Sequence, residues 1–349
     1  MSTHHAVFPT QPDDAFIAAW RTHIEGTGYP ELFANVSTSK PEQDEGIELL
    51  SEEIRVPVGL REGGSRVPCP FCSRHGPKFE RGRMAYFPIE HVVRFIGRHC
   101  AIKHFGENYH DAEKRYRQQA ACREYITFWK EMAARRDELE DFFAQIEPVA
   151  ANLAFVRRQI DDQAPGFASF LYGELVQSNG DLVIVTHTGV KDRHGNAVDE
   201  RKSIGRAVGR SLLAREFDPK KAIDKAKAAM HDLTVDLPGW SPDDHETTMA
   251  IVNRGWKAVK GLRALVDLRT ELADAQRFLE PKNLRVIERW ANDPSSPIVS
   301  LTLRRDGKQL LIRSGSYAGK HYSNAIVPET TFAALPPVSH PIVGSIPLK

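Results

Sequence analysis

The sequence predicts a mainly helical α+β protein, in which a small zinc-binding module precedes long heptad-type helices that each lead into a β-hairpin. Three observations support this fold class. Cys69, Cys72 and Cys100 fall within one 32-residue window, and two long stretches repeat apolar residues in steps of four and three. Each of these stretches is followed by alternating apolar residues around an Asn-Gly or Asp-Gly pair. With 349 residues, 41% hydrophobic and 27% charged, the chain has the composition of a core-forming protein of two or three domains.

The same patterns divide the chain into six predicted segments. The first, 1–60, holds an amphipathic helix from Asp13 to His23 and a strand from Glu53 to Leu60. The others are a zinc-binding module at 61–110, a long helix with a β-hairpin at 111–200, a helical insert at 201–260, a second long helix with a β-hairpin at 261–330, and an extended Pro-rich tail at 331–349. In the insert, Asp218-Pro219 is expected to cap a helix, because proline suits the first helical turn.

The zinc module rests on the pattern C-x2-C-x27-C-x3-H, formed by Cys69, Cys72, Cys100 and His104. The first pair makes a knuckle that Pro68 and Pro70 stiffen, and Pro88 is expected to start a helix through Ile89 and Ile96. Cys100 and His104 are spaced i, i+4, so they share a helix face. Three sulfurs and one nitrogen form the closed tetrahedral set of a structural Zn²⁺, which leaves no position for a catalytic water.

Two alternatives to this ligand set stay open. His99 or His75 can replace one ligand, although His99 points about 100° away from Cys100 on a helix. An unrelated knuckle beside a buried Cys/His pair would also give the pattern. The stretch CPFCSRHGPKF resembles the opening of the zinc ribbons of DNA primases, but the second ligand pair departs from that pattern, so no function is carried over. Cys122 lies in a helical pattern and is expected to be a packed thiol.

The zinc module coincides with the basic part of the chain. Residues 61–117 hold 12 Lys and Arg against 6 Asp and Glu, whereas the rest holds 35 against 40, which makes the overall net charge only +1. A local positive field beside a metal site predicts nucleic-acid binding through phosphate contacts. The candidate residues are Arg66, Arg74, Lys78, Arg81, Arg83, Arg94, Arg98 and Lys103. The alternative is an ordinary solvated basic surface. The Tyr317–Tyr322 loop, which includes Lys320 and His321, is an additional candidate surface, and its composition also describes an ordinary exposed loop.

Two heptad seams follow the zinc module. The first contains Tyr125, Trp129, Met132, Leu139, Phe143, Ile146, Ala150, Leu153 and Ile160, with Pro148 expected to kink or divide the helix. The second contains Leu262, Leu265, Leu272, Leu279, Val286 and Trp290, with polar Arg269, Gln276 and Asn283 in alternate places. Such seams predict pairing within the chain or self-association, which would make the protein an assembly or adaptor protein. This hypothesis is compatible with nucleic-acid binding.

A degenerate internal duplication is a further hypothesis. At an offset of 133 residues, Glu147-Pro148 falls on Glu280-Pro281 and the heptad phase is kept. Hairpins are predicted after each helix, with turns at Asn179-Gly180 and Asp306-Gly307. Heptads also resemble one another by composition alone, so both explanations of the likeness stay open.

An enzyme is the third hypothesis, and its support in the sequence is the weakest. The candidate groups are His187, Asp192 and His194, and separately the run Asp243, Asp244, His245 and Glu246. None has a recognised catalytic spacing, and the acidic run is explained more simply as charge at a helix N-terminus. No transmembrane run or signal peptide is recognised, so a cytoplasmic location is expected. The preference for arginine over lysine is typical of a GC-rich bacterial, phage or mobile-element source.

Overall fold

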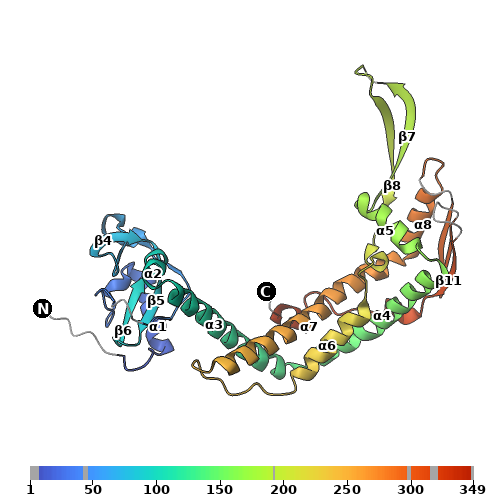
Figure 1. Cartoon of the computed structure of the whole chain (residues 1–349). Helices are drawn as coiled ribbons and strands as arrows, with labels where there is room; N and C mark the ends of the chain where they lie inside the picture. Colours follow the sequence, from blue (N-terminus) through green and yellow to red (C-terminus); the bar gives the residue numbers. More distant parts are fainter. Residues whose placement is uncertain (1–7, 42–45, 192, 297–299, 315–320, 347–349) are drawn as a thin grey trace. The chain divides into compact units, whose positions relative to one another are not determined.

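The computed structural model describes residues 8–41, 46–191, 193–296, 300–314 and 321–346. The chain forms two compact units, shown in Figure 1. We call Met1–Glu124 with Gly239–Val252 the N-terminal unit, and Tyr125–Pro238 with Asn253–Lys349 the C-terminal unit. The predicted class, mainly helical α+β, is confirmed. Among the described residues no helix is both long enough and apolar enough to cross a lipid bilayer.

The N-terminal unit is built around strand β5 (Arg81–Phe87). The antiparallel partners of β5 are β1 (Glu48–Leu49), β2 (Ile54–Arg55) and β6 (Val92–Ile96). The predicted N-terminal helix is confirmed as α1 (Asp14–Thr27), and the Asp13 side chain caps it by accepting a hydrogen bond from Phe16 N at 2.8 Å. The first 60 residues thus share a sheet with the segment that carries the cysteines.

Successive side chains of β5 point to opposite faces of the sheet. All of them after Arg81 are buried, so both faces of the sheet are covered at β5. Met84 and Tyr86 pack with Trp20 and Ile24 of α1. Ala85 and Phe87 pack on the other face with residues of α2 (Arg98–Phe105) and α3 (Glu107–Ala134).

The helix predicted to start at Pro88 is wrong. Residues Arg81–Ile96 form the β5–β6 hairpin, in which His91 adopts a positive φ of 56°. The apolar residues Val92, Val93 and Ile96 satisfy helical spacing, but a short run rich in β-branched side chains is equally typical of a buried strand. The helix begins only at Arg98.

The C-terminal unit has one core, to which both heptad seams contribute. The first seam lies on the end of α3 and on α4 (Arg136–Gln163), and the second lies on α7 (His245–Phe278) and α8 (Pro281–Ala291). The helical break in the first seam falls at Arg135, and α4 continues through Pro148. Within a single chain most apolar seam residues are buried, and Tyr125 and Val286 are partly buried against the same core, so their packing requires no second copy.

The hairpin predicted around Asn179-Gly180 is wrong in its first strand. Phe167–Gln177 form a helix, α5, and Asn179 and Gly180 adopt left-handed backbone at its end, with φ of 52° and 78°. The following strand β7 (Asp181–Lys191) pairs instead with β8 (Ala197–Arg206), which occupies part of the predicted helical insert. The base of the β7–β8 hairpin packs against α8, and its far end stands away from the helices of this unit (Figure 1).

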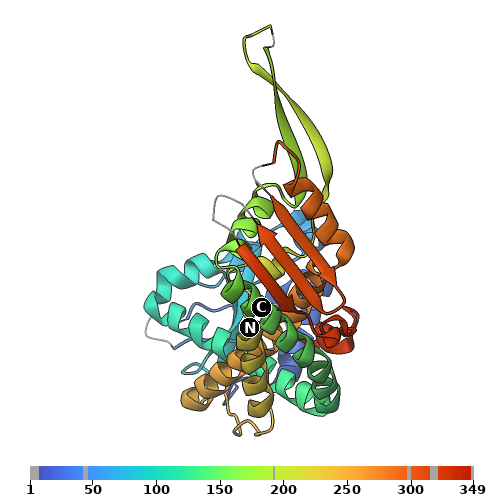
Figure 2. The same cartoon turned by 90° about the vertical axis from the view of Figure 1, so that its right-hand side faces the viewer.

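The second predicted hairpin is confirmed as β9 (Leu301–Asp306) and β10 (Gln309–Ser314). A third strand, β11 (His321–Ile326), joins β10 on its other side, as Figure 2 shows. The capping of α6 (Pro219–Asp232) by Asp218 is also confirmed, since its carboxylate accepts a hydrogen bond from Lys221 N at 3.1 Å.

The Pro-rich tail is not simply extended. It contains helix α9 (Pro341–Ser345), and Ile342 and Ile346 are buried in the core of the C-terminal unit. The two halves of the predicted duplication differ in their elements, because Pro148 lies inside α4 while Pro281 begins α8. The duplication therefore stays a prediction.

Candidate metal centre

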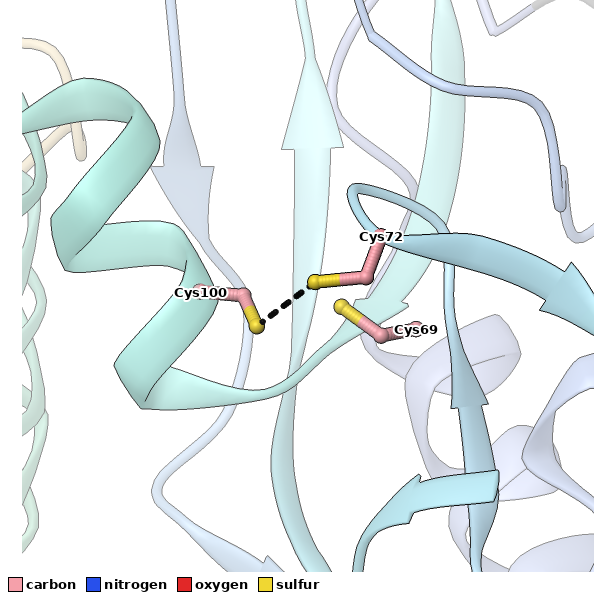
Figure 3. Close-up of side chains that lie close together, drawn as sticks. All are labelled: Cys69, Cys72 and Cys100. Atoms are coloured by element: carbon pink, nitrogen blue, oxygen red, sulfur yellow. Dashed lines mark hydrogen bonds between the residues drawn. The ribbon is translucent and has the colours of Figure 1, made fainter. Parts of the chain in front are cut away.

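Three of the four predicted metal ligands meet in the N-terminal unit. Cys69 ends strand β3 (Val67–Cys69), which pairs with β4 (Ser73–Phe79), and Cys72 lies in the turn between them. Cys100 comes from the first turn of α2. The three Sγ atoms lie within 4.8 Å of one another, and those of Cys72 and Cys100 are 3.2 Å apart (Figure 3). All three are free thiols.

The knuckle turn explains how Cys69 and Cys72 come together. Cys72 N donates a hydrogen bond to Cys69 O at 3.2 Å, which closes the turn and holds both side chains on one side. Cys69 is buried, Cys100 is half-buried and Cys72 is exposed. The centre therefore has a covered side and a side open to solvent.

Burial makes a negative charge unfavourable on two of the three thiols, Cys69 and Cys100. Burial, followed by hydrogen bonding to the Cys72 and Cys69 thiols, raises the pKa of Cys100 to about 12. Burial also raises the pKa of Cys69. A bound cation reverses this balance because it stabilises thiolates directly. In the described part of the chain, these cysteines are the one group of Cys, His, Asp or Glu side chains arranged to hold a metal ion.

His104, the fourth predicted ligand, is not among the side chains that converge. Its ring lies 5.0 Å from that of Phe71 and 4.7 Å from that of Phe105, measured between centroids. Its Nε2 atom is buried without a hydrogen-bond partner. His99 is exposed, and the side chain of His75 lies outside the described residues.

A groove of about 570 Å³ adjoins the cysteines, with Cys100 in its wall. We call it the basic groove. Four of the predicted nucleic-acid-binding side chains line it, all exposed, together with His99 and two glutamates. These four are Arg66, Lys78, Arg81 and Arg98. Arg66 pairs with Glu80, one of the two glutamates, at 3.1 Å.

The other four predicted residues do not line the basic groove. Arg83 and Arg94 are buried, where Arg83 pairs with Glu113 at 2.8 Å and Arg94 pairs with Glu90 at 2.5 Å. Their guanidinium groups form ion pairs inside the unit, so neither is available to bind phosphate at its surface. Lys103 is exposed on α2 outside the groove, and the side chain of Arg74 lies outside the described residues.

The residues of the enzyme hypothesis do not assemble into a described site. His194 is exposed in the β7–β8 connection, while Asp192 and the side chain of His187 lie outside the described residues. Asp244 is confirmed as a helix cap, because its carboxylate accepts hydrogen bonds from Thr247 N at 2.9 Å and Thr247 Oγ1 at 2.6 Å. The Tyr317–Lys320 part of the predicted loop is also outside the described residues, as are the side chains of His321 and Tyr322.

A separate polar cavity of about 180 Å³ was not predicted. It is lined by Glu48, Arg115, Asp243 and His245, among others. Burial and the neighbouring charge of Asp243 raise the pKa of Glu48, while Arg115 lowers it. No spacing in the sequence connects Glu48 with Asp243, because they meet only when β1 and residues 239–252 fold into the same unit.

Comparison with known proteins identifies no relative. The chain matches no protein-family model, no curated protein and no solved structure.

Proposed function

We propose that the N-terminal unit is a zinc-stabilised module that binds nucleic acid through the basic groove. The observation that carries this proposal is the position of Cys100, which belongs both to the cysteine cluster and to the wall of the basic groove. A metal ion that fixes the start of α2 against the knuckle would therefore also fix one side of the groove.

The donor set supports zinc as the metal. Thiolates are soft ligands, and tetrahedral Zn²⁺ with Zn–S distances of ~2.3 Å places its sulfurs about 3.8 Å apart. The observed spacing, within 4.8 Å and as short as 3.2 Å, brackets that value. His104 is our proposed fourth ligand, since it lies one helical turn beyond Cys100 and its Nε2 atom lacks a partner. Its ring would have to move closer to the three Sγ atoms to reach the metal.

The charge of the groove supports nucleic acid as the ligand. Four exposed cationic side chains face two glutamates, of which Glu80 already pairs with Arg66. Exposed Lys and Arg bind phosphate oxygens without reading base sequence, and they release counterions when they do so. We therefore propose binding through the nucleic-acid backbone, with affinity that falls as salt rises.

The test combines a metal assay with a binding assay on the full chain. Purified protein should hold one equivalent of Zn²⁺ and bind short duplex or single-stranded DNA at low salt. Lys78→Glu with Arg81→Glu should make the negative slope of log K against log salt shallower by about 2, because two phosphate contacts are lost. Lys40→Glu with Lys114→Glu, exposed positions of the same unit outside the groove, is the control of equal charge change.

Two results would overturn the proposal. If protein purified under reducing conditions contains no zinc, the N-terminal unit is not a zinc-stabilised module. Equal loss of DNA binding in the groove pair and the control pair would show that the basic groove is not the binding site.

A further inference from the structure

The C-terminal unit contains a second cationic pocket that the sequence did not indicate. Its volume is about 340 Å³, and it is lined by Arg206, Arg210 and Arg277. We call it the arginine pocket. Arg206 ends β8, Arg210 begins the short 3₁₀ helix η4 (Arg210–Leu213), and Arg277 lies in the last turn of α7.

The loop that presents Arg206 and Arg210 is held in place by two side chains of the helices behind it. Asp274 accepts hydrogen bonds from Gly209 N, Ser211 N and Ser211 Oγ at 3.2, 3.0 and 2.8 Å. Asn283, which is buried, accepts one from Val208 N at 2.9 Å and donates one to Val208 O at 3.0 Å. The loop is therefore fixed before any ligand arrives, which reduces the entropic cost of binding.

The three guanidinium groups have few anionic partners of their own. Arg277 is 4.0 Å from Asp274, and Arg206 is 3.7 Å from Asp181, both near the outer limit for an ion pair. Asp274 is already occupied by the loop. Arg210 is exposed and has no ion pair with any described residue. Three cations around one pocket, with one lining carboxylate engaged elsewhere, favour an anionic ligand with several oxygens.

Beyond the pocket, further exposed cations lie on β8 and α8, mixed with acidic residues. Strand β8 carries the exposed Arg201 and Lys202 ahead of Arg206, directly after the acidic Asp199 and Glu200. Helix α8 packs against β8 and carries the exposed Arg285 and Arg289, with Arg289 Nη2 donating to Ile204 O at 2.8 Å. Exposed cations outside the pocket offer a polymer of phosphates additional contacts that a single small anion cannot make.

We propose that the arginine pocket binds a backbone phosphate of nucleic acid and gives the C-terminal unit its own contact with that ligand. The identity of the ligand rests on the proposed function. The preference for a phosphate oxygen rests on the pocket alone.

The test measures binding of duplex DNA by Arg210→Glu with Arg277→Glu. Lys221→Glu with Lys225→Glu, on exposed positions of α6 in the same unit, is the control of equal charge change. The pocket pair should weaken binding at low salt about tenfold or more and lower the salt slope by about 2, whereas the control pair should leave the salt slope unchanged. Arg210→Gln with Arg277→Gln should show a smaller loss in the same direction, and it avoids new carboxylates beside Asp274.

The outcomes separate this inference from the proposed function. If Lys78→Glu with Arg81→Glu weakens binding but the pocket pairs match their control, the arginine pocket is excluded and the basic groove stands. If the pocket pairs weaken binding and the groove pair does not, the basic groove is excluded and the arginine pocket stands. If inorganic phosphate binds the wild type but not the pocket pairs, and duplex DNA does not bind, the nucleic-acid assignment of the arginine pocket is overturned.

Discussion

Glu113 of α3 lies where three arginine side chains meet. Its carboxylate is 2.8 Å from Arg83, 3.1 Å from Arg117 and 3.5 Å from Arg98, and its side chain is only 8% exposed. Arg83 is equally buried, while Arg117 is 68% exposed. Since Arg98 also lines the basic groove, Glu113 joins the interior of the N-terminal unit to the proposed binding surface.

Glu113→Ala should therefore destabilise the N-terminal unit by about 3–5 kcal/mol, because it leaves Arg83 buried without its carboxylate. Arg117→Ala should cost about 1 kcal/mol or less, because an exposed ion pair contributes little. Urea denaturation, followed by far-ultraviolet circular dichroism, measures both. Similar losses in the two variants would show that burial of the Arg83–Glu113 pair does not contribute to stability as argued.

The residues also show what a sequence leaves undetermined at a candidate site. The Cys69–Cys72 knuckle and the position of Cys100 on a helix follow from local spacing, and the cysteines do converge. The local sequence around an arginine in a basic segment does not show whether its side chain faces solvent or a buried glutamate. The burial of Arg83 and Arg94 depends on Glu113 and on strand pairing, which local sequence does not specify.

At the scale of elements, the loop between β8 and η4 depends on one glycine. Gly209 has a φ of 83°, and a Cβ atom there would lie 2.1 Å from Phe278 N. Backbone cannot yield as a flexible side chain can, so the close approach of this loop to the end of α7 requires glycine.

Gly209→Ala should destabilise the C-terminal unit by roughly 3 kcal/mol or more, which combines left-handed strain with steric overlap. Gly166→Ala is the matched control, since Gly166 has a φ of 82° but no atom within 4 Å of an added Cβ. The control should cost only the strain, about 1–2 kcal/mol. Thermal unfolding compares the two variants, and equal midpoints would contradict the overlap with Phe278.

Elements with strong local signals were predictable. A helix forms next to Asp13, Asp218 caps α6 and the Asp306-Gly307 hairpin forms, because each depends on neighbouring residues only. Asn179-Gly180 was misread because left-handed backbone serves the end of a helix as well as a hairpin turn. The partner of β7, which lies further along the chain, decided between the two.

At the scale of the whole molecule, the chain has separate cores in its two units. The clusters around Trp20 and around Phe87 belong to the N-terminal unit, and the seam residues belong to the C-terminal unit. Two unfolding transitions are therefore expected, because each unit has its own core. A ligand that binds one unit stabilises that unit.

Zinc should raise the midpoint of one thermal transition and leave the other unchanged. At a free concentration 1,000 times its dissociation constant, the ion stabilises its unit by about 4 kcal/mol. Differential scanning calorimetry with Zn²⁺, and then with a chelator, measures this shift and its reversal. Cys100→Ser should lose most of the shift, and a shift of both transitions in the wild type would contradict independent units.

The β7–β8 hairpin has a consequence for how the protein behaves at high concentration. Each strand pairs with just one neighbouring strand in the described part of the chain, so each has an edge beside which no other strand lies. Near the base of the hairpin, Val183 O accepts a hydrogen bond from Trp290 Nε1, and Ile204 O accepts one from Arg289 Nη2. β8 carries four consecutive charged residues, Asp199 to Lys202, which oppose edge-to-edge pairing. β7 presents exposed Val183, Val185 and Val190, whereas β8 presents one exposed valine, Val198. Aggregation by strand addition is therefore favoured along β7 and disfavoured along β8.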